Sequence, residues 1–217
     1  TITGLGEGAI KTCVITGYPE SEAGAYYLWA RVDTDQQVDE YNENNNLFGP
    51  QAFNLLKPLG EALDDKTKTW DTGGDADWFG QTAVSFNDGD AAQSGDIADN
   101  QISSVETTVT GSGTLKFYWK VSSEQNFDYL RFYIDEVEQP GSISGAVGWQ
   151  EKNFSIGAGN HTLKWAYTKD GSESNGSDAG WLDKVTFTSD LDEALDNMSL
   201  PWSTGGTANW YKQTAVS

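Results

Sequence analysis

Apolar and polar side chains alternate along several short stretches in the second half of the chain. In residues 114–121, 130–135 and 162–167, every second residue is aliphatic or aromatic. This period of two is typical of half-buried antiparallel strands. Turn clusters rich in glycine separate the stretches, at 111–113, 139–142, 157–160 and 170–180. Short strands joined by such turns predict an all-β fold, an antiparallel β-sandwich of the jelly-roll type, with a barrel as the open alternative. The pattern predicts one short helix, around residues 59–65.

The first 50 residues form a separate piece of the chain. Their pattern predicts strands at 9–14, 26–32 and 38–41. Three strands are too few to close a sandwich or to bury a useful core. We therefore expect residues 1–48 to be the C-terminal part of an immunoglobulin-like (Ig-like) domain. Residues 49–58, which contain two prolines, predict a linker.

One segment of the chain occurs twice. Residues 59–85 and 191–217 align without gaps, and 16 of their 27 positions are identical. The repeated motif is W-x-T-G-G-x-A-x-W, carried by Trp70, Gly73, Gly74 and Trp78 and again by Trp202, Gly205, Gly206 and Trp210. The repeat predicts one module over residues 59–190 and the start of a second copy at 191–217. Repetition favours a role for these tryptophans in packing the start of a strand onto the next module, and a sugar-stacking platform is the alternative.

Charge and composition exclude several classes of function. The chain has 33 acidic and 13 basic residues, a net charge of -20, one His and one Cys. A surface of this sign repels phosphate, so we expect neither nucleic-acid binding nor attraction to anionic membranes. Single His and Cys residues exclude a multi-His or multi-Cys metal site and an intrachain disulfide. No run of 18 apolar residues occurs, which predicts no membrane insertion. The remaining oxygen-rich chemistry suits Ca²⁺.

One carboxylate stands out against the strand pattern. In the stretch 181–187, Asp183 alternates in phase with Trp181 and Val185, which places it on an apolar face. Burying a carboxylate there costs several kcal/mol unless it is paired or bound to a metal. The alternative to metal binding is that Asp183 pairs with lysine or backbone amides. In that case two other aspartates, Asp88 and Asp90, form a solvated turn and bind no metal.

Two parts of the chain resemble known families. The segment AGAYYLWARVDTDQQVDEYNENNN resembles the last strands of the CARDB domain, a bacterial adhesion-related Ig-like module. The module 59–190, with stretches such as FYWKVSSE, DYLRFYID and GSDAGWLDKVTF, resembles a MAM/lectin-like jelly-roll repeat of large bacterial surface or secreted proteins. Both resemblances imply adhesive, matrix or carbohydrate-associated roles, and neither implies catalysis.

A narrower resemblance concerns the metal. The pattern W-x-D-x-V-x-F at 181–187 resembles the last strand of calcium-binding jelly-roll carbohydrate modules, where that aspartate is a calcium ligand. In that fold the first strand lies beside the last one, which implies that Asp88 and Asp90 join Asp183 around Ca²⁺.

Other candidate residues carry weaker signals. Glu124 and Asp128 flank an aromatic loop and could in principle form a glycosidase pair. With no cleft evident in the pattern, turn capping and solvated charge are favoured for them. Trp149 and Tyr129 are the best remaining candidates for stacking on a glycan.

Together these observations predict a non-enzymatic extracellular or cell-surface protein with a structural or adhesive role. We expect calcium-stabilised tandem modules in a fibre or surface assembly, in which copies of the chain contact one another head-to-tail or side by side. Residues 191–217 are expected to pack against another unit. The alternative is a carbohydrate-binding module of a secreted multidomain enzyme.

Overall fold

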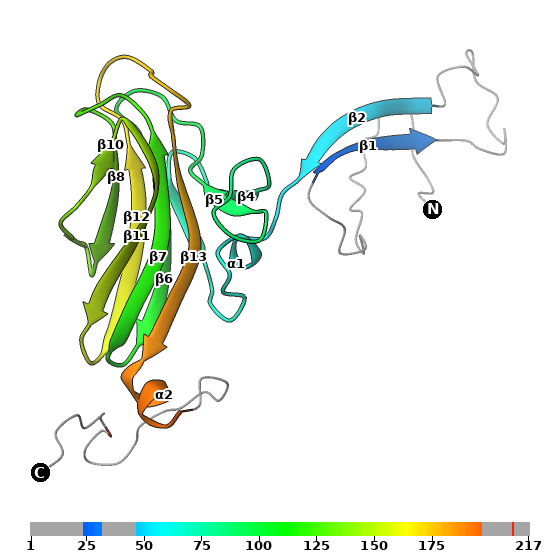
Figure 1. The fold of residues 1–217 in the computed structure, drawn as a ribbon. Helices are drawn as coiled ribbons and strands as arrows, with labels where there is room; N and C mark the ends of the chain where they lie inside the picture. Colours follow the sequence, from blue (N-terminus) through cyan, green and yellow to red (C-terminus); the bar gives the residue numbers. More distant parts are fainter. Residues whose placement is uncertain (1–23, 32–46, 197–209, 211–217) are drawn as a thin grey trace, which may run out of the picture. The chain divides into compact units, whose positions relative to one another are not determined.

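A computed structural model describes residues 24–31, 47–196 and 210 (Figure 1). The chain divides into two units, residues 1–55 and 56–217, and each is described by itself. None of the helices in the described ranges is long and apolar enough to cross a membrane.

The described part of the first unit is a pair of antiparallel strands, β1 (Gly24–Arg31) and β2 (Leu47–Leu55). The first agrees with the strand predicted at 26–32, whereas those predicted at 9–14 and 38–41 lie outside the described residues.

Strand β2 corrects one expectation, because residues 49–55 of the predicted linker belong to it. The prolines and the missing alternation suggested a linker. The pairing of β1 with β2 shifts register between Leu28 and Ala30, opposite Pro50. A bulge is a position where proline is tolerated in a strand.

The second unit is a sandwich of two antiparallel sheets (Figure 1). One sheet has the order β10-β8-β12-β6-β3, with β9 beside β8, and the other has the order β11-β7-β13-β5-β4. The strands are β3 (Asp71–Gly74), β4 (Phe79–Gln81), β5 (Ala91–Gln93), β6 (Ile102–Thr110), β7 (Gly113–Ser122), β8 (Tyr129–Ile134), β9 (Val137–Glu138), β10 (Ile143–Ser144), β11 (Ala146–Ile156), β12 (Asn160–Thr168) and β13 (Ala179–Ser189). The predicted fold class, an antiparallel β-sandwich, is confirmed.

Aromatic side chains fill the space between the two sheets. In β7, alternate residues from Gly113 to Val121 are buried, as the sequence pattern predicts. Phe117 from one sheet contacts Phe132 and Trp165 from the other, with ring centroids 5.1 and 5.2 Å apart. Large buried aromatic groups of this kind dominate the hydrophobic stabilisation of a core.

Both copies of the repeat begin with the same short helix. Helix α1 (Leu59–Ala62) lies where the sequence predicts a helix, and α2 (Asp190–Ala194) covers the residues 132 positions later. Each helix ends at an alanine and has a leucine as its C-cap. The next residue is an aspartate in the left-handed region, Asp64 with φ 61° and Asp196 with φ 50°. The two copies therefore share local backbone structure as well as sequence.

The repeated tryptophan motif packs into the core of its own module. Trp78 is 3% exposed, and Trp70 packs against the core beside Trp165, with ring centroids 6.1 Å apart. The Trp70 Nε1 donates to the main-chain oxygen of Asp65 at 3.0 Å. Trp78 is too deeply buried to stack on a sugar, and Trp70 is half-buried against the same core. Both tryptophans of the first copy therefore pack against their own module. Of the second copy, the structure describes only Trp210, which is 76% exposed.

Gly74 shows why the motif contains glycine. Its φ is 93°, and an added Cβ would lie 2.2 Å from the main-chain oxygen of Ile102. Gly111 has a similar φ of 90°, but no atom lies within 4 Å of its added Cβ. Of these two glycines, Gly74 alone combines a left-handed backbone with close approach of a neighbouring strand.

We predict that Gly74→Ala destabilises the module more than Gly111→Ala. Both variants acquire the left-handed strain, about 1–2 kcal/mol. Gly74→Ala adds a steric clash of about 1–3 kcal/mol. Urea unfolding of the two variants measures the difference, and equal losses of unfolding free energy would show that the contact with Ile102 relaxes freely.

Candidate metal centre

A β-bulge in β13 gives the site its shape. The pairing of β13 with β7 shifts register between Asp183 and Thr186, and Lys184 has a φ of 52°. The bulge leaves the Val185 N–H to donate to the main-chain oxygen of Leu63 at 3.0 Å. This bond draws the end of α1, and with it Asp64, against the middle of the last strand.

Asp183 is the buried member of the site. Its side chain is 0% exposed, and its Oδ2 accepts hydrogen bonds from the backbone N–H groups of Phe86 (2.7 Å) and Asn87 (3.0 Å). Its Oδ1 is equally buried but has no hydrogen-bond partner. A buried carboxylate oxygen without a partner carries a large desolvation cost. The unpartnered oxygen is therefore the strongest pointer to a missing ligand.

Two further carboxylates, Asp64 and Asp88, face Asp183. One oxygen of each of the three lies within 4.8 Å of the others. Asp64 and Asp88 are exposed, and both have a positive φ. The amide of Asn87 donates to Asp64 Oδ2 at 3.1 Å and so holds that carboxylate beside the loop. One buried and two exposed carboxylates leave the cluster open to solvent on one side.

The electrostatics of the cluster favour a bound cation. Burial, together with the charges of Asp64 and Asp88, raises the pKa of Asp183 to about 6, although its two backbone hydrogen bonds oppose the shift. Burial and the neighbouring Asp88 also raise the pKa of Asp64. Among the described residues, no lysine, arginine or histidine forms a salt bridge with these three carboxylates. Oxygen donors at this spacing suit Ca²⁺ better than a transition metal.

The structure brings two of the three predicted metal ligands together and leaves out Asp90. Gly89, with φ 98°, turns the chain after Asp88. Asp90 is 6% exposed and pairs with Lys57 at 3.4 Å. Sequence reasoning missed Asp64, although one signal was available. Asp64 is among the identical positions of the repeat and corresponds to Asp196.

The loop whose backbone N–H groups donate hydrogen bonds to Asp183 also contributes to an aromatic cluster. Phe86 is 44% exposed and stacks on Tyr118 of β7, with ring centroids 3.8 Å apart at 13°. The predicted glycan residue Trp149 of β11 lies next to Phe86, 6.1 Å between centroids. We call Phe86, Tyr118 and Trp149 the aromatic surface. The strands β7 and β11, which carry Tyr118 and Trp149, belong to the five-stranded sheet.

The other predicted glycan residue, Tyr129, lies elsewhere. It belongs to β8 in the opposite sheet, and the guanidinium of Arg131 covers its ring at 4.4 Å. The structure therefore does not combine Tyr129 and Trp149 in one site. Alternation in the sequence can indicate that a residue belongs to a strand, but it cannot show which of the two sheets contains that strand.

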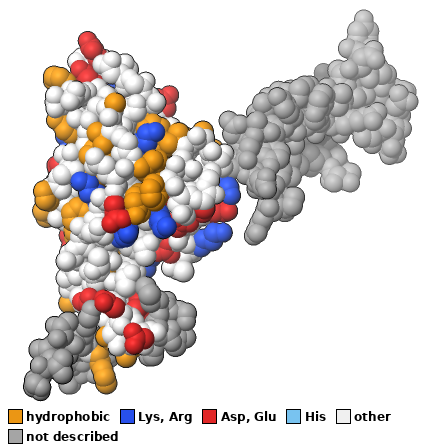
Figure 2. Space-filling view, in the orientation of Figure 1, with side chains coloured by type: hydrophobic (Ala, Val, Ile, Leu, Met, Phe, Trp, Pro, Cys, Tyr) orange, Lys and Arg blue, Asp and Glu red, His pale blue; other side chains and the backbone are white. Residues whose placement is uncertain are grey.

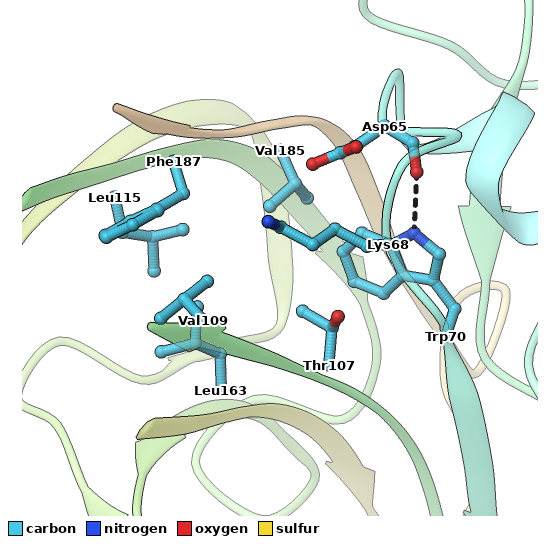
Figure 3. A pocket seen from close by; sticks show the side chains of 9 residues that line it. All are labelled: Asp65, Lys68, Trp70, Thr107, Val109, Leu115, Leu163, Val185 and Phe187. Carbon is cyan, nitrogen blue, oxygen red and sulfur yellow. Dashed lines mark hydrogen bonds between the residues drawn. The ribbon is translucent and has the colours of Figure 1, made fainter. Parts of the chain in front are cut away.

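A small pocket opens beside Trp70, where Lys68 lies over apolar side chains (Figure 3). Its volume of about 190 Å³ includes the open mouth and is smaller than the ~300–1,000 Å³ of ordinary ligand pockets. The lining residues are Asp65, Lys68, Trp70, Thr107, Val109, Leu115, Leu163, Val185 and Phe187. The pocket is a gap at the edge of the core, and it does not overlap the carboxylate cluster.

Acidic and basic side chains are interspersed on the face of the module shown in Figure 2. Acidic side chains lie at both ends of the sandwich and also beside basic side chains near its middle (Figure 2).

Solved structures that match the chain include a protease, an adhesin domain and a protein in complex with a sugar. The secreted serine protease VesC from Vibrio cholerae matches with a TM-score of 0.47 and 15% identity, over 63% of this chain and 30% of that one. The K1 cleaved adhesin domain of Lys-gingipain from Porphyromonas gingivalis W83 matches with a TM-score of 0.41 and 14% identity, over 57% and 94%. TmCBM61 in complex with β-1,4-galactotriose matches with a TM-score of 0.38 and 12% identity, over 55% and 88%.

Comparison by sequence gives one match. No curated protein matches the chain. The CARDB family model matches residues 1–49, which confirms the resemblance predicted for this first piece.

Proposed function

We propose that residues 59–190 form a non-catalytic, calcium-stabilised module of an extracellular adhesive or structural protein. The observation that carries the proposal is the carboxylate of Asp183, which is fully buried, has one unpartnered oxygen and faces Asp64 and Asp88. The adhesive part of the proposal is supported by the CARDB match in residues 1–49.

Calcium at this site would act as a structural cross-link. Asp64 follows α1, Asp88 lies in the loop before β5, and Asp183 lies in the last strand. These residues are far apart in the sequence, and a cation bridging them would tie the beginning of the module to its end. A ligand that binds only the folded state stabilises it by mass action.

Tandem repetition supports a structural role. The second copy repeats α1 as α2 and repeats Asp64 as Asp196, with the same backbone conformation. We propose that a complete second module buries Trp210 as the first module buries Trp78. Contacts between copies of the chain, whether head-to-tail or side by side, belong to the same proposal, and most of residues 191–217 lie outside the described part.

The test is thermal unfolding of the 217-residue chain with chelator and with excess Ca²⁺. At a Ca²⁺ concentration 100 times the Kd, stabilisation is about 2.7 kcal/mol. For a domain of this size, that corresponds to about 5–11 °C in Tm. The same Tm under both conditions would refute calcium stabilisation.

We predict that protons compete with calcium at Asp183. Its pKa is raised to about 6 in the folded chain, against about 3.9 in an unfolded one. Between these values the metal-free folded state binds more protons, so Asp183's contribution to stability falls as pH rises from 4 to 6. Calcium requires the ionised form, so affinity should fall below pH 6. Calorimetric titrations at pH 7.5 and pH 5 measure this, and a pH-independent affinity would contradict it.

A second candidate function is glycan binding at the aromatic surface. The exposed ring of Phe86 supports it, because flat aromatic faces with polar neighbours can stack on sugars. Lys116 and Glu151, 2.8 Å apart, provide such polar groups beside Tyr118. This candidate corresponds to a carbohydrate-binding module of a larger secreted enzyme.

We predict that Phe86→Ala and Trp149→Ala abolish binding of any glycan that a panel identifies. Tyr129→Ala is the matched control, because Tyr129 lies in the opposite sheet. Since Asp183 holds the backbone of Phe86, the binding should also weaken with chelator. A glycan array read with and without Ca²⁺ tests both points, and silence across the array would count against this candidate.

A further inference from the structure

A second group of three carboxylates lies at one end of the sandwich. Glu124 and Asp128 belong to the loop between β7 and β8, and Asp170 follows β12. One oxygen of each lies within 4.8 Å of the others. The two loops lie at the same end because Ser122 pairs with Ala179, and Tyr129 with Thr168.

Asp128 is the buried centre of this group. Its side chain is 0% exposed, and its Oδ1 accepts a hydrogen bond from the backbone N–H of Asp170 at 2.9 Å. Its Oδ2 is buried and has no partner, and the same holds for Oε2 of Glu124. Two buried, unpartnered carboxylate oxygens in one cluster point to a ligand that binds both.

The nearby Lys169 opposes the negative charge of the group only in part, since its charge lowers the pKa of Glu124 and Asp128 less than burial raises it. Lys169 has a side chain only 1% exposed, and its amine contacts Asp178, Ser174 at 2.7 Å and Asp99 at 3.6 Å. Asp178 and Glu173 add further negative charge close by. Burial raises the pKa of both Asp128 and Glu124, as expected for crowded carboxylates. The lysine is already shared among other oxygen atoms.

We propose that Glu124, Asp128 and Asp170 bind a second Ca²⁺, separate from the one at Asp183. All three ligands offer oxygen, and their spacing is compatible with ligand distances of about 2.3–2.6 Å to a shared ion. The ion would hold the β7–β8 loop against the long loop at 169–178. This role also gives a reason for the acidic pair Glu124 and Asp128, for which sequence reasoning favoured turn capping.

The test is calorimetric titration of CaCl₂ into the chelator-treated 217-residue chain. We expect Asp128→Asn and Glu124→Gln each to bind one equivalent fewer than the wild type. Asp183→Asn should also lose one equivalent, and the combination Asp128→Asn with Asp183→Asn should lose two. Asp96→Asn, at an exposed aspartate, is the control for charge and should match the wild type.

The variants separate failure of this site from failure of the site at Asp183. If Asp128→Asn and Glu124→Gln titrate like the wild type while Asp183→Asn loses one equivalent, the second site is overturned and the first stands. The reverse result leaves the second site and overturns the first. Near-UV circular dichroism checks folding. If Asp128→Asn does not fold, the half-buried Glu124→Gln decides the outcome.

Discussion

We expect Asp183→Asn to remove the calcium-dependent stability that arises at this site. Asparagine keeps an oxygen that can accept the backbone bonds of Phe86 and Asn87, but it lacks the charge that attracts Ca²⁺. In excess Ca²⁺, the unfolding free energy should fall by about 2–3 kcal/mol relative to the wild type. In chelator the difference should shrink or reverse, because a buried unpaired carboxylate is itself costly. Thermal unfolding under both conditions measures the effect.

The control for this prediction is Asp96→Asn. It changes the net charge equally, and Asp96 is exposed and outside both carboxylate clusters. Its calcium-dependent Tm shift should equal that of the wild type. If Asp183→Asn retained the full shift, the stabilising calcium would have to bind elsewhere.

The second large effect is expected at the repeated tryptophans. Trp78→Ala should lower the unfolding free energy of the module by about 3–5 kcal/mol, because it removes a buried indole and leaves a cavity. Trp210 occupies the equivalent position of the second copy but is 76% exposed in this chain. Trp210→Ala should therefore change the unfolding free energy by less than about 0.5 kcal/mol. Urea unfolding of both variants tests the contrast.

The two variants control each other, because they make the same chemical change in the same motif. Equal losses would mean that the second copy already packs as the first does. In a longer chain that contains the complete second module, we expect Trp210→Ala to become as destabilising as Trp78→Ala. A persistently small effect there would contradict the proposed role of the motif in every copy.

The sandwich could largely be predicted from the alternating pattern. Strands such as β7 bury every second residue, so the period of two is visible in Leu115, Phe117 and Trp119. Strand β2 could not be predicted, because its pairing depends on a bulge opposite Pro50 and not on alternation. Helix α2 follows from the repeat once α1 is known, since Leu191 corresponds to Leu59.

The candidate metal site could be predicted in part. Asp183 could be identified as a candidate ligand because a carboxylate in phase with apolar residues contradicts the strand pattern. Asp64 depends on tertiary contacts, chiefly the bond from the Val185 N–H to Leu63, which the bulge at Lys184 makes available. Asp90 and Asp88 are two residues apart, and only the backbone turn at Gly89 separates their environments. Long-range contacts and local φ values of this kind can hardly be inferred from a single sequence.

The most direct test of calcium binding at Asp183 is a crystal structure of the chain grown with Ca²⁺. Anomalous diffraction locates the ion independently of stability measurements. We predict an anomalous peak about 2.3–2.6 Å from carboxylate oxygens of Asp64, Asp88 and Asp183. A well-ordered site without such a peak, with Asp183 Oδ1 bound to water or a lysine instead, would contradict calcium binding by these three aspartates.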